Sequence, residues 1–229
     1  MLLDGFFAIC KAMLQTGITP DFVTVDGAEG GTGAAPIEFT NHVGMPLREG
    51  LVLVQNALVG VGLRDRIRIA ASGKQVTASA IAASMALGAD WCNSARGFMF
   101  AVGCIQAQAC HTNECPVGVA TQNPRLQRGL VVPDKAERVA NFHRNTVEAL
   151  AEIVSAAGLN HPAQLTPSHV YLRTNDLDVH PLDHVYTLCG PGDLLENRGG
   201  RLQPAWDRAD ANRFHTPIDD RSSASEPLS

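Results

Sequence analysis

Aromatic residues and positive charge are both scarce in this chain. Its 229 residues include only two tryptophans and two tyrosines, and the formal net charge is -5. A nucleic-acid-binding surface usually combines a basic stripe with aromatic side chains, so we expect no nucleic-acid partner. No apolar run approaches the roughly 20 residues of a membrane span, and the sequence Met1-Leu2-Leu3-Asp4-Gly5 lacks the basic start of a signal peptide. We expect a cytoplasmic protein that does not bind membranes.

The apolar fraction of 45% is large enough for a globular core of one large domain or two small ones. Six cysteines could in principle form disulfides. The lack of a secretory signal and the clustering of three of them favour a reducing compartment. We expect the other three, Cys10, Cys92 and Cys189, to be buried thiols.

Three cysteines, Cys104, Cys110 and Cys115, form a C-x5-C-x4-C-P cluster. Thiolates are soft ligands for iron–sulfur clusters, zinc or cuprous copper. Zinc usually takes paired knuckles and a fourth ligand, and His111 is a poor candidate because a lone loop histidine is more often a hydrogen-bonding residue. Three thiolates suit a three-iron cluster better, and the remaining alternative is that they are buried thiols without a metal.

Helix-like and strand-like segments alternate along the first half of the chain. Short apolar runs are typical of buried parallel strands, and the amphipathic runs between them are typical of crossover helices. This order predicts an α/β fold, either open or closed into a (β/α)8 barrel. A complete barrel needs eight strands and about 250 residues, so most of a barrel would be missing. The expected helices are 6–15, 46–61, 76–87 and 135–157, and the expected strands are 22–25, 67–71 and 90–93.

A glycine-rich loop follows the first expected strand, and α/β active sites lie at this end of parallel strands. Glycine lets backbone N–H groups approach a ligand closely, so the loop is a candidate to line a planar cofactor or an anionic substrate. An ordinary long turn is the alternative. The loop residues concerned are Gly30, Gly31, Thr32 and Gly33.

The next two expected strands both end in small residues followed by a cation. The first gives Ser72, Gly73 and Lys74, and the second gives Ala95 and Arg96. In (β/α)8 proteins a phosphate site forms from the loops after the last two strands and a helix N-terminus. The repeated pattern predicts a site for the phosphate of flavin mononucleotide (FMN), unless both cations are merely solvated at helix starts.

Taken together, the segments 25–36, 72–74 and 103–122 resemble the C-terminal part of FMN-binding glutamate synthase family proteins. The likeness covers about residues 5–195 and is most specific at the cysteine loop, where order, spacing and the trailing proline agree. The resemblance implies part of a (β/α)8 TIM barrel that carries FMN and a [3Fe-4S] cluster. It implies reductive amination of 2-oxoglutarate to glutamate, with ammonia or glutamine-derived nitrogen.

The resemblance also assigns roles to residues, although it identifies no catalytic residue. The implied cluster ligands are Cys104, Cys110 and Cys115, and the implied FMN-binding residues are Gly30, Gly31, Thr32, Gly33, Ser72, Gly73, Lys74, Ala95 and Arg96. Full-length relatives carry earlier barrel strands that are absent from this sequence. The alternative functions are therefore a non-catalytic metal-binding fragment, or a subunit that needs the missing barrel half or a redox partner.

We expect residues 1–195 to form one domain that contains the iron–sulfur loop 103–122 and the covering helix 135–157. From residue 196 onward the sequence is rich in Arg, Asp, Gly, Ser and Pro. Such segments bury too little apolar surface to order themselves, so we expect a disordered tail over 196–229.

Overall fold

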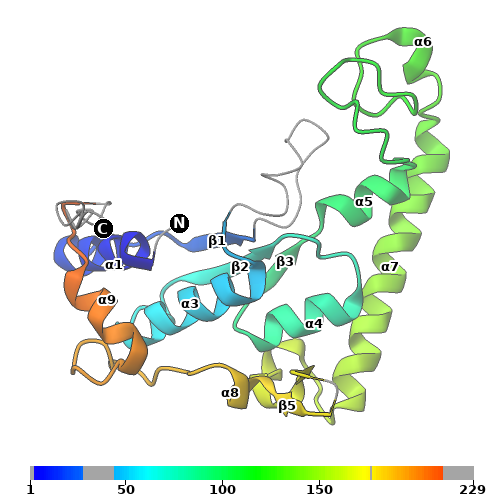
Figure 1. Ribbon diagram of the computed structural model, residues 1–229. Coiled ribbons are helices and arrows are strands. Elements are labelled where there is room, and N and C mark those ends of the chain that lie inside the picture. Colours follow the sequence, from blue (N-terminus) through cyan, green and yellow to red (C-terminus); the bar gives the residue numbers. More distant parts are fainter. Residues whose placement is uncertain (1–2, 28–43, 176, 214–229) are drawn as a thin grey trace, which may run out of the picture.

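The computed structural model of this protein describes residues 3–27, 44–175 and 177–213. At its centre lies a parallel sheet of three strands in the order β1-β2-β3 (Figure 1). The strands are β1 (Phe22–Asp26), β2 (Arg68–Ser72) and β3 (Trp91–Asn93). The predicted α/β class with parallel strands is confirmed. Over the described ranges the sheet stays open, so the barrel remains a prediction.

Three helices lie on one side of the sheet: α1 (Leu3–Thr16), α3 (Leu47–Gly60) and α4 (Ala78–Ala86). Helix α3 contacts β1 and β2, α4 contacts β3, and α1 packs on α3. Successive side chains of a strand point to opposite faces. Ile69 and Ala71 therefore point into this helical layer, where both are completely buried.

The other face of the sheet presents exposed side chains. Phe22 and Trp91 are 51% and 37% exposed and meet edge to face with their ring centroids 5.3 Å apart. Two large aromatic rings are thus left at the surface of a sheet whose other face packs against helices. This asymmetry is expected of a sheet that has not closed on itself.

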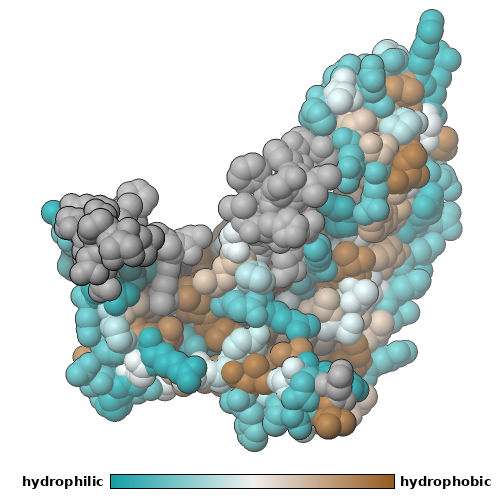
Figure 2. Space-filling model, in the orientation of Figure 1, coloured by the Kyte–Doolittle hydropathy of each residue, from teal (hydrophilic) through white to brown (hydrophobic). Residues whose placement is uncertain are grey.

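Helix α7 (Val132–Ala156) is the long covering helix predicted at 135–157. It begins earlier than predicted because Pro133 sits at its second position, where a missing backbone N–H costs little. Both α4 and α5 (Ala95–Val102) pack on it, and its outer flank is mainly hydrophilic (Figures 1 and 2). No helix in the described ranges has both the length and the apolar character needed to cross a bilayer.

Short elements follow α7 and lead the chain back toward α1 (Figure 1). In the described ranges they include three 3-10 turns, an antiparallel hairpin and two short helices. Their bounds are η1 (Pro162–Gln164), η2 (Pro167–His169), β4 (Tyr171–Arg173), β5 (Val179–Pro181), α8 (Leu182–Val185), η3 (Gly200–Leu202) and α9 (Gln203–Arg208), and a further short helix, α6 (Pro124–Gln127), precedes α7.

The expectation of a disordered tail from residue 196 is wrong for residues 196–213. Helix α9 packs on α1, and Trp206 is 8% exposed with its ring edge to face with Phe7 at a centroid distance of 5.7 Å. The Nζ atom of Lys11 lies 4.9 Å from the Trp206 ring and donates to the Ala209 carbonyl at 2.7 Å. Burial of one large side chain therefore orders a segment whose composition is mostly polar. Residues 214–229 lie outside the described ranges.

Candidate functional site

The carboxyl ends of the three parallel strands bring the predicted phosphate segments to one edge of the sheet. Asp26 pairs in register with Ser72, and Ser72 pairs with Asn93. The Lys74 turn starts two residues after Ser72, and Arg96 follows three residues after Asn93. The structure therefore places both cationic segments after adjacent strand ends, as the sequence predicted.

The turn after β2 has a backbone that lies close to the chain following β1. The Gly27 N–H donates to the Ser72 carbonyl at 3.0 Å. Gly73 has φ of +128°, and a Cβ there would lie 3.1 Å from the Gly27 carbonyl oxygen. Lys74 is also left-handed, with φ of +48°. A glycine is thus required at 73 both for its dihedral angle and for the close approach of two backbones.

Gln75 holds this turn in place, although sequence reasoning did not single it out. Its side chain is buried, donating to the Gly73 carbonyl at 3.0 Å and accepting from the Ser84 hydroxyl at 3.1 Å. The turn that presents Lys74 is thereby tied to α4. A polar residue directly after a Gly-Lys pair was the only signal for this role.

The second cationic segment opens helix α5. Ala95 and Arg96 are its first two residues, and Ser94 is its N-cap. The Ser94 hydroxyl oxygen is buried, yet it has no hydrogen-bond partner within the part of the chain that the structure describes. A helix N-terminus with a spare hydroxyl suits an anionic group, because its backbone N–H groups and dipole favour negative charge. These residues fit the phosphate of FMN chemically.

The predicted glycine loop cannot be placed on this edge. Gly30, Gly31, Thr32 and Gly33 lie outside the described residues. The described chain stops at Gly27 and resumes at Gly44, directly before α3. The role of this loop beside a flavin therefore remains a prediction.

The three clustered cysteines lie in the loop between α5 and α6, at the end of the molecule farthest from α9 (Figure 1). All three are free thiols; Cys104 and Cys110 are half-buried and Cys115 is buried. Among the described residues, no three His, Cys, Asp or Glu side chains converge as a metal site would require. The structure thus places the thiols in one loop without gathering them around a common centre.

The sulfur environments nevertheless suit thiolates. Backbone N–H groups lower the pKa of Cys115, chiefly that of Ala120, with smaller contributions from residues 117–119. The Cys104 sulfur accepts a bond from the Gln106 N–H at 3.4 Å. By contrast, burial alone raises the pKa of Cys10 to about 12. Hydrogen bonds to sulfur are typical of iron–sulfur ligands, so the donor set fits a three-thiolate cluster chemically.

Two residues that sequence reasoning missed fasten the second half of this loop. The Thr121 hydroxyl donates to the Asn113 carbonyl at 2.5 Å, and the Asn113 side-chain oxygen accepts from the Gln122 N–H, also at 2.5 Å. Asn113 can do this because its backbone is left-handed, with φ of +66°. An asparagine inside a cysteine loop was the available signal, because this residue tolerates that conformation better than most.

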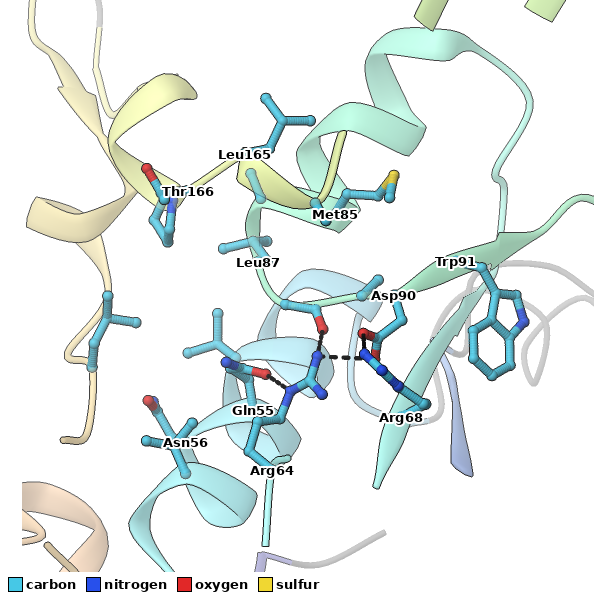
Figure 3. Close-up of a pocket in the computed structure, with 18 of the residues that line it drawn as sticks. Gln55, Asn56, Arg64, Arg68, Met85, Leu87, Asp90, Trp91, Leu165 and Thr166 are labelled. Carbon is cyan, nitrogen blue, oxygen red and sulfur yellow. Dashed lines mark hydrogen bonds and ion pairs between the residues drawn. The ribbon is translucent and has the colours of Figure 1, made fainter. Parts of the chain in front are cut away.

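A cavity of about 610 Å³ lies at the opposite, amino-terminal end of the strands (Figure 3). Arg64 lines this cavity. Its guanidinium group donates hydrogen bonds to Gln55, to the Ile67 and Gly88 carbonyls and to Asp90. The Asp90 carboxylate also accepts from Arg68 and from the Ile69 N–H. These polar groups satisfy one another, so they brace β2 against β3. Active sites of parallel sheets lie at the other end.

Replacing Asp90 with asparagine is expected to lower the free energy of unfolding by about 2 to 3 kcal/mol, chiefly because Arg64, which like Asp90 is 19% exposed, loses its charged acceptor. The pair with Arg68 adds little, because that side chain is 65% exposed. Urea unfolding followed by circular dichroism measures this change. The matched control is Asp65→Asn, which alters an exposed carboxylate on the neighbouring turn and should be nearly neutral. Equal stability of the two variants would show that the Asp90 brace contributes nothing.

Comparison with known proteins adds to this geometry. Residues 8–160 match a family model described as a conserved region in glutamate synthase. The glutamate synthase large subunit-like protein YerD of Bacillus subtilis (strain 168) is 46% identical over 173 residues, which cover 76% of this chain and 33% of YerD. The archaeal glutamate synthase [NADPH] of Methanocaldococcus jannaschii is 37% identical over 163 residues, covering 71% of this chain and 32% of the relative. The chain thus spans about a third of the length of these two relatives.

Proposed function

Because this chain belongs to the glutamate synthase family, we propose that it supplies the FMN-phosphate and iron–sulfur part of a glutamate-synthase-type oxidoreductase. The proposed overall reaction is the reductive amination of 2-oxoglutarate to glutamate. The nitrogen would be ammonia or glutamine-derived, and a redox partner would supply electrons.

One observation carries this proposal above the others. Ser72 and Asn93 are register partners at the carboxyl edge of the sheet, so the segments that begin with them leave the sheet side by side. One segment presents Gly73 and Lys74, and the other presents the α5 N-terminus with the Ser94 hydroxyl, which has no hydrogen-bond partner among the described residues. Two adjacent strand ends with cations and a helix start are typical of phosphate sites in α/β proteins.

Each residue has a defined task in this proposal. Lys74 and Arg96 supply positive charge to the phosphate, and Ser94 and the first N–H groups of α5 supply hydrogen bonds. Cys104, Cys110 and Cys115 would hold the [3Fe-4S] cluster through their thiolates. The bound flavin and cluster would supply the redox chemistry, and the protein would position them and tune their potentials.

The ultraviolet–visible spectrum of the anaerobically purified chain tests the proposal, with iron, zinc and released FMN quantified in the same sample. We expect iron together with stoichiometric FMN. Zinc without iron would contradict the cluster assignment, and a colourless protein without either metal or flavin would contradict the proposal as a whole.

A second candidate function is a metal-binding part that needs further strands before it can bind flavin. The observation that favours it is that the sheet is open over the described ranges, which leaves Phe22 and Trp91 exposed on one face. A partner that contributes further strands would cover that face. Iron without FMN in the purified chain, with FMN bound only after such a partner is added, would favour this candidate.

Replacing Lys74 with alanine is expected to weaken FMN binding about ten- to a hundredfold, because one charge-assisted contact to phosphate is lost, worth about 1.5 to 3 kcal/mol. Iron content should not change, since the cysteine loop lies on another segment. Fluorescence titration of the flavin-free protein with FMN measures the affinity.

The matched control for this change is Arg66→Ala, which removes an exposed cation before the amino-terminal end of β2. It should leave the FMN affinity unchanged. Equal weakening in both variants would mean that net charge, rather than a phosphate contact of Lys74, governs binding. Parallel loss of iron and FMN in Lys74→Ala would mean that the fold had collapsed.

A further inference from the structure

Two cations of α7 converge on the residue that precedes the first clustered cysteine. A Cβ placed on Gly103 would lie 3.5 Å from Nζ of Lys135 and 3.7 Å from Nη1 of Arg138. Gly103 is the left-handed C-cap of α5, with φ of +112°, and Cys104 follows it directly. Lys135 and Arg138 lie about one helical turn apart, so their side chains reach the same spot from one face of α7.

The position of Lys135 is electrostatically unusual. It is the fourth residue of α7, in the first helical turn, where the helix dipole disfavours a cation. Its side chain is only 20% exposed, and it forms an ion pair with the neighbouring Asp134 at 3.3 Å. Asp134 is 57% exposed, so this ion pair is partly screened by water, and a second anion beside Nζ would stabilise the shielded cation further.

We propose that Lys135 and Arg138 are positioning residues that raise the reduction potential of a cluster held by the cysteine loop. This inference rests on the function proposed above, because it requires the loop to bind a cluster. The second anion beside Lys135 would then be the thiolate-ligated cluster, of which Cys104, the residue after Gly103, is one ligand.

The sign of the effect follows from charge. Reduction of the cluster adds one electron, taken from an external low-potential reductant, and makes an already anionic group more negative. Nearby cations stabilise the reduced form more than the oxidised form. Removing them therefore favours the oxidised cluster and lowers the reduction potential.

A simpler role for both cations would be to neutralise the C-terminus of α5. Helix C-termini carry partial negative charge, and Gly103 caps this one. In that case removing the cations would destabilise the fold and leave the redox equilibrium unchanged. Reduction potential and melting temperature, measured on the same samples, separate these two roles.

The test is a redox titration with dithionite, followed by electron paramagnetic resonance, on the full chain with Lys135→Met and Arg138→Met combined. We expect the reduction equilibrium constant to fall about tenfold, which is about 59 mV for a one-electron couple. The control is Arg144→Met, an exposed cation about 9 Å further along α7 than Arg138, which should leave the potential unchanged. Lys135→Arg keeps the charge and should also leave it unchanged.

The possible results separate failure of the cation role from failure of the proposed cluster. Iron in the wild-type chain with equal potentials in wild type and double variant would overturn this inference alone, as would an equal drop in Arg144→Met. A drop in melting temperature without a potential shift would assign both cations to the α5 C-terminus and overturn it too. Absence of iron from the wild-type chain would overturn the inference and the proposed cluster together.

Discussion

Replacement of Cys110 by serine is expected to reduce bound iron to background. Three thiolates leave the proposed cluster no spare ligand, and a serine hydroxyl is a far weaker, harder donor for iron. Cys110 sits midway along the loop and is half-buried, so the exchange of sulfur for oxygen costs the fold little. Iron analysis and the visible spectrum of the anaerobic protein measure the loss.

The control for this variant is Cys189→Ser, which changes another partly buried thiol, one that lines the cavity at the amino-terminal end of the strands. It should keep its iron. Full iron occupancy in Cys110→Ser would reject the ligand assignment. Loss of iron in both variants would show that iron binding depends on general integrity of the protein rather than on this loop.

Replacing Trp206 with alanine is expected to lower the free energy of unfolding by about 3 to 5 kcal/mol. The ring is 8% exposed, rests on Phe7 and accepts the Lys11 cation on its face. Truncation removes all three interactions and opens a cavity between α1 and α9. For a domain of this size the melting temperature should fall by roughly 6 to 20 °C, measured by calorimetry.

The other tryptophan provides the comparison. Trp91 is 37% exposed on the open face of the sheet and contacts Phe22 edge to face. Trp91→Ala should therefore cost clearly less than Trp206→Ala, because less apolar surface is returned to water. If both changes cost the same, or if Trp206→Ala is neutral, then α9 is not part of the core.

Local patterns in the sequence were sufficient where an element is specified by its own residues. Strand β2 combines an apolar run with a following Gly73, and α7 has Pro133 at its start and Gly158 just after its end. In both cases the predicted and observed ranges differ by only a few residues. Parallel pairing then followed from the alternation of strands and helices.

The missed elements depend on contacts distant in sequence. Helix α5 contains Gly97, which favours a loop by propensity, yet a Cβ there would lie 2.7 Å from the Phe142 ring of α7. Helix α9 has six residues and is ordered by the meeting of Trp206 with Phe7. Neither partner can be identified from periodicity, because each lies tens to hundreds of residues away.

In the candidate site too, some residues could be predicted from the local sequence and others depend on more distant contacts. Lys74 and Arg96 were predicted from their positions after strands, and the register of β2 and β3 places them at one edge. Gln75, whose buried amide fixes the Lys74 turn, could not be predicted, since its partner Ser84 belongs to the next helix. The second half of the cysteine loop likewise depends on Asn113 and Thr121, eight residues apart.

The contact between α1 and α9 joins two segments that the ribosome synthesises far apart in time. Lys11 bonds the carbonyl of Asp207, 196 residues later. At typical synthesis rates, roughly 10 to 40 s pass between the appearance of these two residues. During that interval the apolar side chain of Phe7, completely buried in the finished protein, has no Trp206 to pack against. The apolar surface of α1 that packs on α9 therefore stays uncovered until α9 has been synthesised.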